Sequence, residues 1–302
     1  RFSASYVLAD KWTLNGSIGL YYKLAPYTVL SFRDNNNNLL NQDADYTRSI
    51  HYTIGTEYLP SNSTRFTLEA FYKKYSQVPV SVRDGISLAN LGGDFGVVGN
   101  EDVITNGKGT TYGVEFFAQQ KLTNRFFGTF SYTFFVSRYS GLNGKEIASA
   151  WDNRHLLSFI WGYKFNRNWE LGLKFRYQGG APYTPFDLMA SQLNYLTFGT
   201  GILNYNRLNT LRLDAFHASD IRIDKKWNYK KTTLNLFLDI TNWYKAVNPA
   251  FPQYTFRRNA DNTAFLTTDG QPIRTDGSNA IPLFLDNSDA STIPTIGFIV
   301  EF

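Results

Sequence analysis

The chain has 302 residues, of which 17% are Phe, Tyr or Trp, and it contains no cysteine, so neither a disulfide framework nor a thiolate metal site can form. Its formal net charge of +5 is small for this length, and Lys and Arg are scattered among acidic residues, which argues against nucleic-acid binding. No stretch approaches the roughly 18 apolar residues that a membrane-spanning helix needs.

Alternation of apolar and polar residues begins at the first residue and predicts β-strands, because successive side chains of a strand point to opposite faces. In residues 1–10, Phe2, Ala4, Tyr6 and Leu8 share one face. The same pattern returns in ten further segments, which span 12–22, 50–59, 65–75, 110–122, 125–137, 155–165, 169–178, 219–227, 232–244 and 293–302. We therefore expect an all-β chain with about eleven strands.

The connections between these segments alternate between short and long. The short ones are 10–11, 60–64, 123–124, 166–168 and 228–231, and they are rich in the turn-forming residues Asn, Ser and Asp. The long ones are about 23–49, 80–109, 139–154, 179–218 and 246–292. Short turns at one end and long loops at the other are typical of a transmembrane antiparallel β-barrel, with periplasmic turns and extracellular loops.

Strand length and the placement of aromatic residues favour the same fold. Strands of about 10 residues, tilted by roughly 40°, cover about 25 Å, which is the height of the apolar band of such barrels. Aromatic residues at strand ends suit the girdles at the two membrane interfaces; they are Trp12, Tyr21, Tyr22, Tyr58, Trp169, Tyr177, Trp227, Trp243 and Tyr244. A soluble β-sandwich or propeller remains the alternative fold, although its strands are usually nearer 5 or 6 residues.

Charged residues of both signs occupy the polar parity of the strands. They are Glu57, Glu69, Lys73, Glu115, Glu170, Lys174, Arg176, Asp220, Arg222, Asp224, Asp239 and Glu301. Because charge on the lipid side is costly at mid-depth, we expect these residues to face the interior of the barrel. A water-filled pore and a barrel closed by a plug domain would both tolerate this mixture of charges.

The end of the chain resembles a known bacterial signal. Ile296, Phe298, Val300 and Phe302 alternate in "IGFIVEF", and the terminal aromatic is similar to the signal that outer-membrane barrels present to their assembly machinery. Because bacterial barrels close with even strand numbers, eleven strands predict that residues 1–302 are the C-terminal part of one barrel domain and that earlier strands are missing.

A family resemblance extends mainly over 151–302. "WDNRHLLSFIWGYKFNRNWELGLKFRYQGGAPYTP" (151–185) and "LRLDAFHASDIRIDKKWNYKKTTLNLFLDITNWYKAVN" (211–248) look like the late-barrel region of TonB-dependent outer-membrane receptors of the Bacteroidetes type. The resemblance implies strands 12–22 of a 22-stranded barrel in a Gram-negative outer membrane. It further implies uptake of a scarce ligand, powered by the TonB complex acting on a plug domain that lies outside these residues.

The resemblance also implies partners: outer-membrane lipid, the plug domain with the TonB complex, the barrel-assembly machinery and, as a further candidate, a surface lipoprotein or another outer-membrane subunit. Two alternatives stay open within the barrel reading. One is a passive porin of about 12 to 16 strands. The other is a barrel that serves as a structural subunit of an outer-membrane complex.

Ligand contact is expected in the long loops, since loops of this length are often functional. The candidate residues are Tyr183, Tyr205 and Tyr254, within a larger set of loop aromatics formed with Tyr195, Phe198, Phe251 and Phe256. These rings could stack on a ligand or hold the loops together.

The sequence gives little support for enzyme activity, a metal site or another cofactor. Asp152, His155 and Ser158 have the residue types of a catalytic triad, but His155 and Ser158 lie on opposite parities of one strand. Of the other histidines, His51 is expected inside the barrel beside Glu57, and His217 in a loop.

Two loop segments were further candidates for ligand chemistry. The Gly-rich segment 91–99 does not connect a strand to a helix as a phosphate loop would. The aspartates of the last long loop lack the spacing of a calcium loop; they are Asp261, Asp269, Asp276, Asp286 and Asp289.

Overall fold

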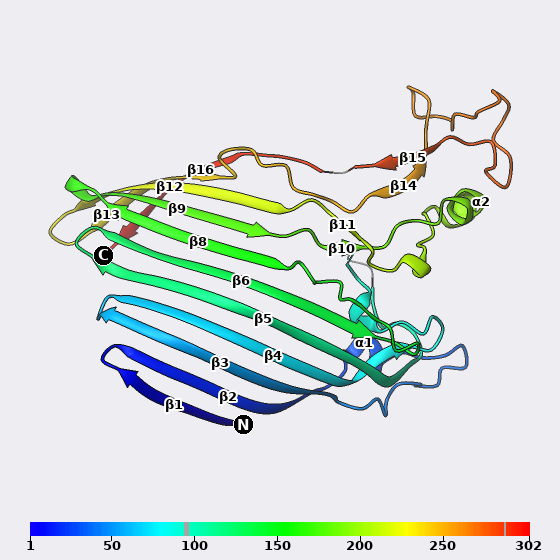
Figure 1. Ribbon diagram of the computed structural model, residues 1–302. Helices are drawn as coiled ribbons and strands as arrows, with labels where there is room; N and C mark the ends of the chain where they lie inside the picture. Colours follow the sequence, from blue (N-terminus) through cyan, green and yellow to red (C-terminus); the bar gives the residue numbers. More distant parts are fainter. Residues whose placement is uncertain (94–96, 287) are drawn as a thin grey trace.

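The computed structural model describes residues 1–93, 97–286 and 288–302. Within them, one large antiparallel sheet runs in the order β1-β2-β3-β4-β5-β6-β8-β9-β12-β13-β16, and the short strand β7 pairs with β6 (Figure 1). The strands of this sheet are β1 (Phe2–Ala9), β2 (Trp12–Lys23), β3 (Thr47–Ser61), β4 (Thr64–Ser81), β5 (Val103–Thr123), β6 (Phe126–Ser140), β7 (Glu146–Ala148), β8 (His155–Lys164), β9 (Trp169–Gln178), β12 (Phe216–Asn228), β13 (Thr233–Thr241) and β16 (Ile293–Glu301). The eleven expected strands are confirmed.

Smaller elements lie in the long connections. Two two-stranded sheets pair β10 (Pro182–Tyr183) with β11 (Leu211–Arg212), and β14 (Gln253–Phe256) with β15 (Pro282–Leu285). The helical elements are α1 (Tyr27–Leu30), α2 (Leu188–Phe198) and the 3-10 turns η1 (Leu88–Asn90), η2 (Asn166–Asn168) and η3 (Tyr205–Arg207). Among the described residues, no helix is both long enough and apolar enough to cross a membrane.

Figure 1 shows the short turns gathered at one end of the sheet and the long loops at the other. Residues 10–11 join β1 to β2, and η2 joins β8 to β9, as the sequence predicts. Lys11, Asn124 and Arg167 have positive φ angles of 68°, 55° and 60° within these turns. Such angles reverse the chain over two or three residues, so each strand is antiparallel to the next.

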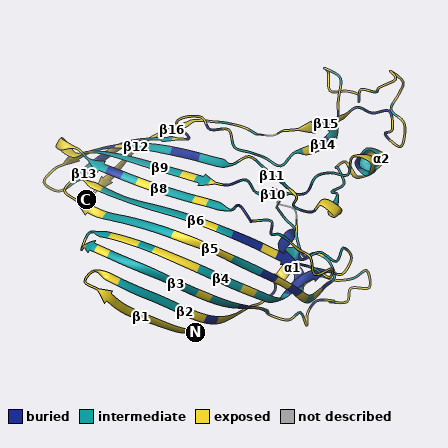
Figure 2. Cartoon of the chain, viewed as in Figure 1, coloured by how far each residue is buried: buried dark blue, intermediate teal, exposed yellow. Residues whose placement is uncertain are grey.

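Several strands are longer than the alternation predicts. β4 continues to Ser81 and β5 starts at Val103, so β5 has 21 residues. Backbone pairing between β4 and β5 continues through these extensions. The apolar–polar alternation is lost there because the extensions pack against loops. Figure 2 shows buried residues at the loop end of β4, β5 and β6, where Val78, Tyr139 and Ala89 form a small core.

The register separates the sheet into an apolar face and a polar face. Opposite residues of an antiparallel pair lie on the same face, so Trp161, Leu173, Ile221 and Ile240 form one continuous row across β8, β9, β12 and β13. Further rows of this apolar face hold exposed residues such as Ile54, 59% exposed. The twelve charged residues expected on the interior parity all fall on the opposite, polar face.

Aromatic rings on the polar face lie over glycines of the neighbouring strand. A Cβ atom at Gly162 would overlap the ring of Phe127, and one at Gly297 would overlap the ring of Phe237. Glycine is required at both positions because the ring occupies the space of a side chain. These pairs cover exposed backbone and fix the register of the strands.

Tyr21 does not belong to the expected aromatic girdle. Its position near a strand end favours a membrane interface, but its odd parity puts it on the polar face, opposite Ser49. Its ring lies over Gly19 and 4.6 Å from the ring of His51. Parity therefore overrides proximity to a strand end in deciding which face an aromatic residue joins.

Candidate functional site

At the loop end, a buried carboxylate joins the segments 151–185 and 211–248. Asp152 has no exposed side-chain surface and accepts hydrogen bonds from Arg154 Nε at 2.9 Å and from Arg212 Nη2 at 2.7 Å. Its other oxygen accepts the backbone N–H of Ser137 at 2.8 Å. The carboxylate therefore holds β6, the start of β8 and β11 together.

The neighbouring residues complete this junction. Asn153 donates to the carbonyl of Gly179 at 2.9 Å, which ties "WDNRH" to the segment "GGAPYTP". Gly180 packs so closely on the carbonyl of Leu213 that a Cβ atom would collide with it. The following residues then pair as β10 with β11. The junction places Tyr183 in β10, beyond the loop end of β9 (Figure 1).

A cavity of about 760 Å³ opens among these loops. Its lining includes Tyr183 of β10, Tyr205 of η3 and Tyr254 of β14, which are the three candidate ligand residues. They lie far apart in the sequence, and the loops bring them together. The volume falls in the range of small-molecule binding sites.

The cavity has an aromatic floor that also holds the loops together. Tyr254 and Phe256 are only 4% and 1% exposed, and Tyr195 of α2 packs on them at ring-centroid distances of 5.8 and 4.6 Å. Phe186 lies 5.9 Å from Tyr254. Of the two roles considered for these aromatics, loop packing is the main role of Tyr254 and Phe256.

The hydroxyl of Tyr254 is the unusual atom of this floor. It is buried, and among the described residues it has no hydrogen-bond partner. Burial, together with the nearby Tyr195, raises the pKa of this phenol above its ordinary value. The group is therefore a neutral donor, and leaving it unpaired costs about 1–3 kcal/mol unless a ligand or water bonds to it.

The rim of the cavity is polar without being charged. Gln253 contributes an amide, whereas the buried amide of Asn90 donates to the carbonyls of Ile147 and Ala148; no described lining residue is acidic or basic. Asn209, in a left-handed conformation with φ 52°, donates to the carbonyls of Asn90 and Ala148 at 2.8 Å each. Sequence reasoning missed these amides, since Asn in a loop is equally common in turns. The uncharged, partly aromatic lining suits a ligand part that is neutral and carries rings.

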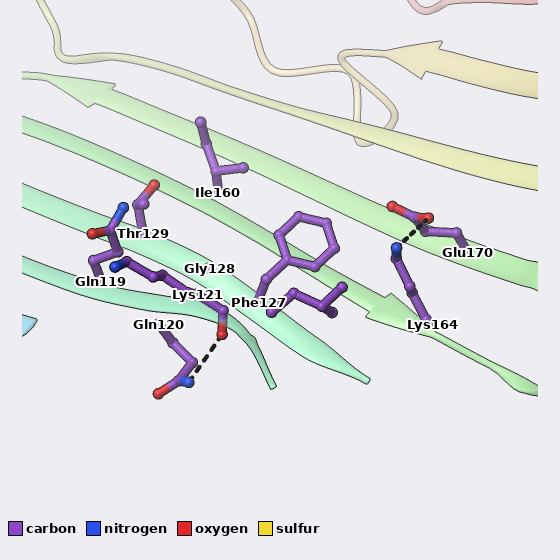
Figure 3. A pocket seen from close by; sticks show the side chains of 10 residues that line it. Gln119, Gln120, Lys121, Phe127, Gly128, Thr129, Ile160, Lys164 and Glu170 are labelled. Atoms are coloured by element: carbon purple, nitrogen blue, oxygen red, sulfur yellow. Dashed lines mark hydrogen bonds and ion pairs between the residues drawn. The ribbon is translucent and has the colours of Figure 1, made fainter. Parts of the chain in front are cut away.

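A second hollow lies at the short-turn end of the polar face (Figure 3). Its volume is about 370 Å³, and it is lined by residues such as Gln119, Thr129 and Phe127, with an ion pair of 3.9 Å between Lys164 and Glu170. None of the expected ligand residues lies there. We regard the loop cavity as the candidate site because it gathers all three of them.

The structure separates the residues of the triad considered above. His155 lies on the apolar face opposite Phe134 and bonds Tyr132 Oη at 2.8 Å, while Ser158 lies on the polar face opposite Arg176. Asp152 is occupied by its two arginines. The opposite orientation predicted for His155 and Ser158 is confirmed.

The other two histidines match the expectation only in part. His217 belongs to β12 rather than to a loop, and it bonds Tyr244 Oη at 2.7 Å. His51 is on the polar face as predicted, but its neighbours are Ser49, at 3.0 Å, and Lys73 rather than Glu57. Strand pairing decides these contacts, and they could not be deduced from position along the chain.

The loop aspartates hold turns together. Asp269 accepts hydrogen bonds from Asn279 at 2.9 Å and from Arg274 at 3.1 Å, and the bond from Asn279 is the main cause of its lowered pKa. Among the described residues, no group of three or more His, Asp or Glu side chains is arranged to hold a metal ion. Of the Gly-rich segment 91–99, residues 94–96 lie outside the described part of the chain.

The residues of the expected assembly signal lie on the last strand. Ile296, Phe298 and Val300 pair with Leu238, Leu236 and Leu234 of β13 on the apolar face. Phe302 follows the strand and is 99% exposed. Ile296, Phe298 and Val300 therefore lie on the apolar face, as their alternation predicts.

Comparison with known proteins agrees with this architecture. The model of the family described as "TonB dependent receptor-like, beta-barrel" matches residues 1–243. No curated protein matches the chain.

Three solved structures have the same fold at low identity. The ferric-catecholate import receptor Fiu of E. coli K12 is 13% identical, with a TM-score of 0.57, over 99% of this chain and 34% of the receptor. The ferripyoverdine receptor of Pseudomonas aeruginosa is 15% identical, with a TM-score of 0.56, over 98% of this chain and 32% of the receptor. The ferric yersiniabactin uptake receptor FyuA of Yersinia pestis is 14% identical, with a TM-score of 0.54, over 99% of this chain and 37% of the receptor. The chain spans about a third of the length of these structures.

Proposed function

Because the chain belongs to the family of TonB-dependent receptor-like β-barrels, we propose that it is part of a receptor that imports a scarce ligand across the outer membrane of a Gram-negative bacterium. The observation that carries the proposal is the separation of the sheet into two faces. The apolar face would contact lipid, and the polar face would line the lumen. The Bacteroidetes-type resemblance of 151–302 supports placing these strands as 12–22 of a 22-stranded barrel, the size of barrels whose lumen holds a plug.

The polar face fits a lumen filled by a plug domain. Its charges are largely paired within the wall: Lys174 and Arg176 lie about the carboxylate of Asp220 at 4.0 and 3.9 Å, and Arg222 bonds Asp224 at 2.9 Å. Such a wall is stable in water and offers hydrogen bonds to a protein surface. Transport would need the TonB complex, which acts on the plug.

We place the long loops outside the cell and the short turns in the periplasm, as in other barrels of this type. The loop cavity would then receive the ligand. Its uncharged lining favours contact with a neutral, ring-bearing part of the ligand. The ferric-catecholate, ferripyoverdine and ferric yersiniabactin receptors named above suggest a ferric chelate as the ligand class.

The last strand would present Ile296, Phe298, Val300 and Phe302 to the barrel-assembly machinery. Ile296, Phe298 and Val300 alternate on the apolar face of β16, and an aromatic residue follows the strand; this pattern supports the proposal. A surface lipoprotein or another outer-membrane subunit would bind the long loops, which lie outside the cell in this proposal.

Transport and passive diffusion can be separated by conductance. The full receptor, reconstituted in a planar bilayer, should show no persistent open channel, because a plug closes the lumen. Uptake of labelled ferric siderophores by cells that express it should stop when TonB is removed. A stable open channel together with uptake that does not need TonB would favour a passive porin; folded barrel without either activity would favour a structural subunit.

Two substitutions test the loop cavity as the ligand site. Tyr254→Phe removes a hydroxyl that has no partner, so the stability of the fold should be unchanged or higher while ligand affinity falls. Tyr205→Ala should lower affinity by about 1–3 kcal/mol if its ring stacks on the ligand. A receptor with both changes and unaltered affinity would place the ligand elsewhere.

A further inference from the structure

The apolar face changes character toward the loop end, between β3 and β6. A row of three tyrosines, Tyr52, Tyr72 and Tyr112, crosses β3, β4 and β5 in register. Each is between 43% and 46% exposed. On the turn side of this row the face is apolar, with Ile54, Ala70 and Val114 as the next residues.

Basic residues follow this tyrosine row on the loop side. The next row contains Lys74 of β4 and Arg138 of β6, each facing Thr110 of β5. One row further, Arg48 of β3 faces Ser76, and Lys108 of β5 faces Ser140. The four basic residues therefore occupy four consecutive strands in a staggered pattern, with diagonal neighbours roughly 7–8 Å apart.

These four side chains, which we call the basic patch, are unpaired. All are exposed, and among the described residues none has an acidic partner within ion-pair distance. Glu146 of β7 is the nearest acid on this face by register, beyond Ser140. On the polar face, by contrast, Arg176 and Arg222 lie beside carboxylates of their own wall. The basic patch thus lacks the compensation that the same sheet provides on its other face.

We propose that the basic patch binds phosphate groups in the headgroups of the lipid leaflet at the loop end. The inference rests on the proposed placement of the apolar face in lipid. Tyrosine belts sit at headgroup level, so residues one and two rows beyond them reach the phosphates rather than the acyl chains. Lys and Arg have long side chains that extend toward such an interface, and clusters of them bind anionic headgroups.

The geometry favours several phosphates on one lipid, or adjacent lipids, over a single ion. The four cations spread across four consecutive strands in two rows, so Arg48 and Arg138 are separated by three strand spacings of roughly 4.8 Å each. The bound molecule must also place acyl chains against the apolar rows on the turn side of the tyrosines. A phosphorylated lipid satisfies both parts of this surface at once.

The test uses the full receptor in nanodiscs of phosphatidylcholine with or without phosphatidic acid, whose headgroup is a phosphate monoester. Bound lipid is counted by native mass spectrometry. The variant K74Q/R138Q is compared with K73Q/R176Q, which removes one Lys and one Arg from the polar face of the same sheet. Phosphatidic acid should be retained in preference to phosphatidylcholine. K74Q/R138Q should weaken the binding of phosphatidic acid roughly 30-fold, because each basic residue near an anionic headgroup strengthens binding by about a factor of five. K73Q/R176Q should retain it.

The outcomes are distinct. Equal retention in both variants, with both proteins inserted and heat-modifiable, overturns the basic patch and leaves the receptor proposal intact. Displacement of the lipid by inorganic phosphate alone would identify a simple anion site and also overturn the proposal. A wild-type receptor that does not insert into lipid at all overturns both. The second pair, R48Q/K108Q, should reproduce the loss, which guards against a folding defect in the first.

Discussion

Exchanging polarity at two adjacent positions of β9 provides a quantitative test of the two faces. Leu173 lies at the middle of the strand on the apolar face, between Trp161 and Ile221. Leu173→Arg would place a cation against hydrocarbon near mid-depth, which costs about 2–4 kcal/mol in such barrels. The folded-to-unfolded ratio should therefore fall by roughly 30- to 1000-fold.

The next residue supplies the matched control. Lys174 lies on the polar face, its side chain 45% exposed and its Nζ 4.0 Å from Asp220. Lys174→Leu removes one solvent-exposed ion pair, and such pairs contribute at most about 1 kcal/mol. Arg176 remains beside the same carboxylate.

Both variants of the full receptor are measured by urea titration in phospholipid vesicles, with heat-modifiability as the indicator of folded barrel. The free energy of unfolding should fall far more for Leu173→Arg than for Lys174→Leu. Equal losses, or a larger loss for Lys174→Leu, would refute the assignment of faces.

Three further predictions concern the chain end and the loops. Deleting Phe302 should slow barrel assembly in cells, seen as delayed appearance of the heat-modifiable form in a pulse-chase experiment; an unchanged rate would remove its role as a signal. Asp152→Ala should destabilise the loop junction by about 3 kcal/mol. This is the low end for a broken buried ion pair, because Arg212 keeps part of its surface in water. Thermal unfolding measures the loss, and a value below about 0.5 kcal/mol, typical of a surface substitution, would contradict the prediction. Because the bond from Asn279 lowers the pKa of Asp269, this contact stabilises the last loop above about pH 4 and is lost as the pH falls further; a nitroxide in that loop should gain mobility only at the acid end, and mobility independent of pH would contradict the contact.

The sequence predicted the paired strands well because their signal is local. Side chains alternate at every second residue wherever one face meets an apolar solvent, and short turns contain residues that reverse the chain. The ends of β4 and β5 were missed because the alternation stops where the strands leave that solvent, although their hydrogen-bonded pairing continues to Ser81 and Val103.

The candidate site was predictable only in part. Tyr183, Tyr205 and Tyr254 were found as loop aromatics, and the structure places all three on one cavity. Tyr254 is buried, whereas Tyr205 is 40% exposed. This difference depends on packing between loops that are remote in sequence. The bond between Asp152 and Arg212 spans 60 residues and has no local signature. Contacts of this kind require the folded loops.

In each long strand, alternate residues are expected to contact hydrocarbon, and the residues between them are expected to contact water. Residues 1–302 contain no cysteine, so single cysteines can be introduced one by one from 170 to 177 of β9 in the full receptor. Each is labelled with a fluorophore and exposed to a lipid-attached quencher and to a water-soluble one. We predict quenching by lipid at the odd positions and by the aqueous reagent at the even positions. Uniform quenching along the strand, or the reverse alternation, would contradict the account.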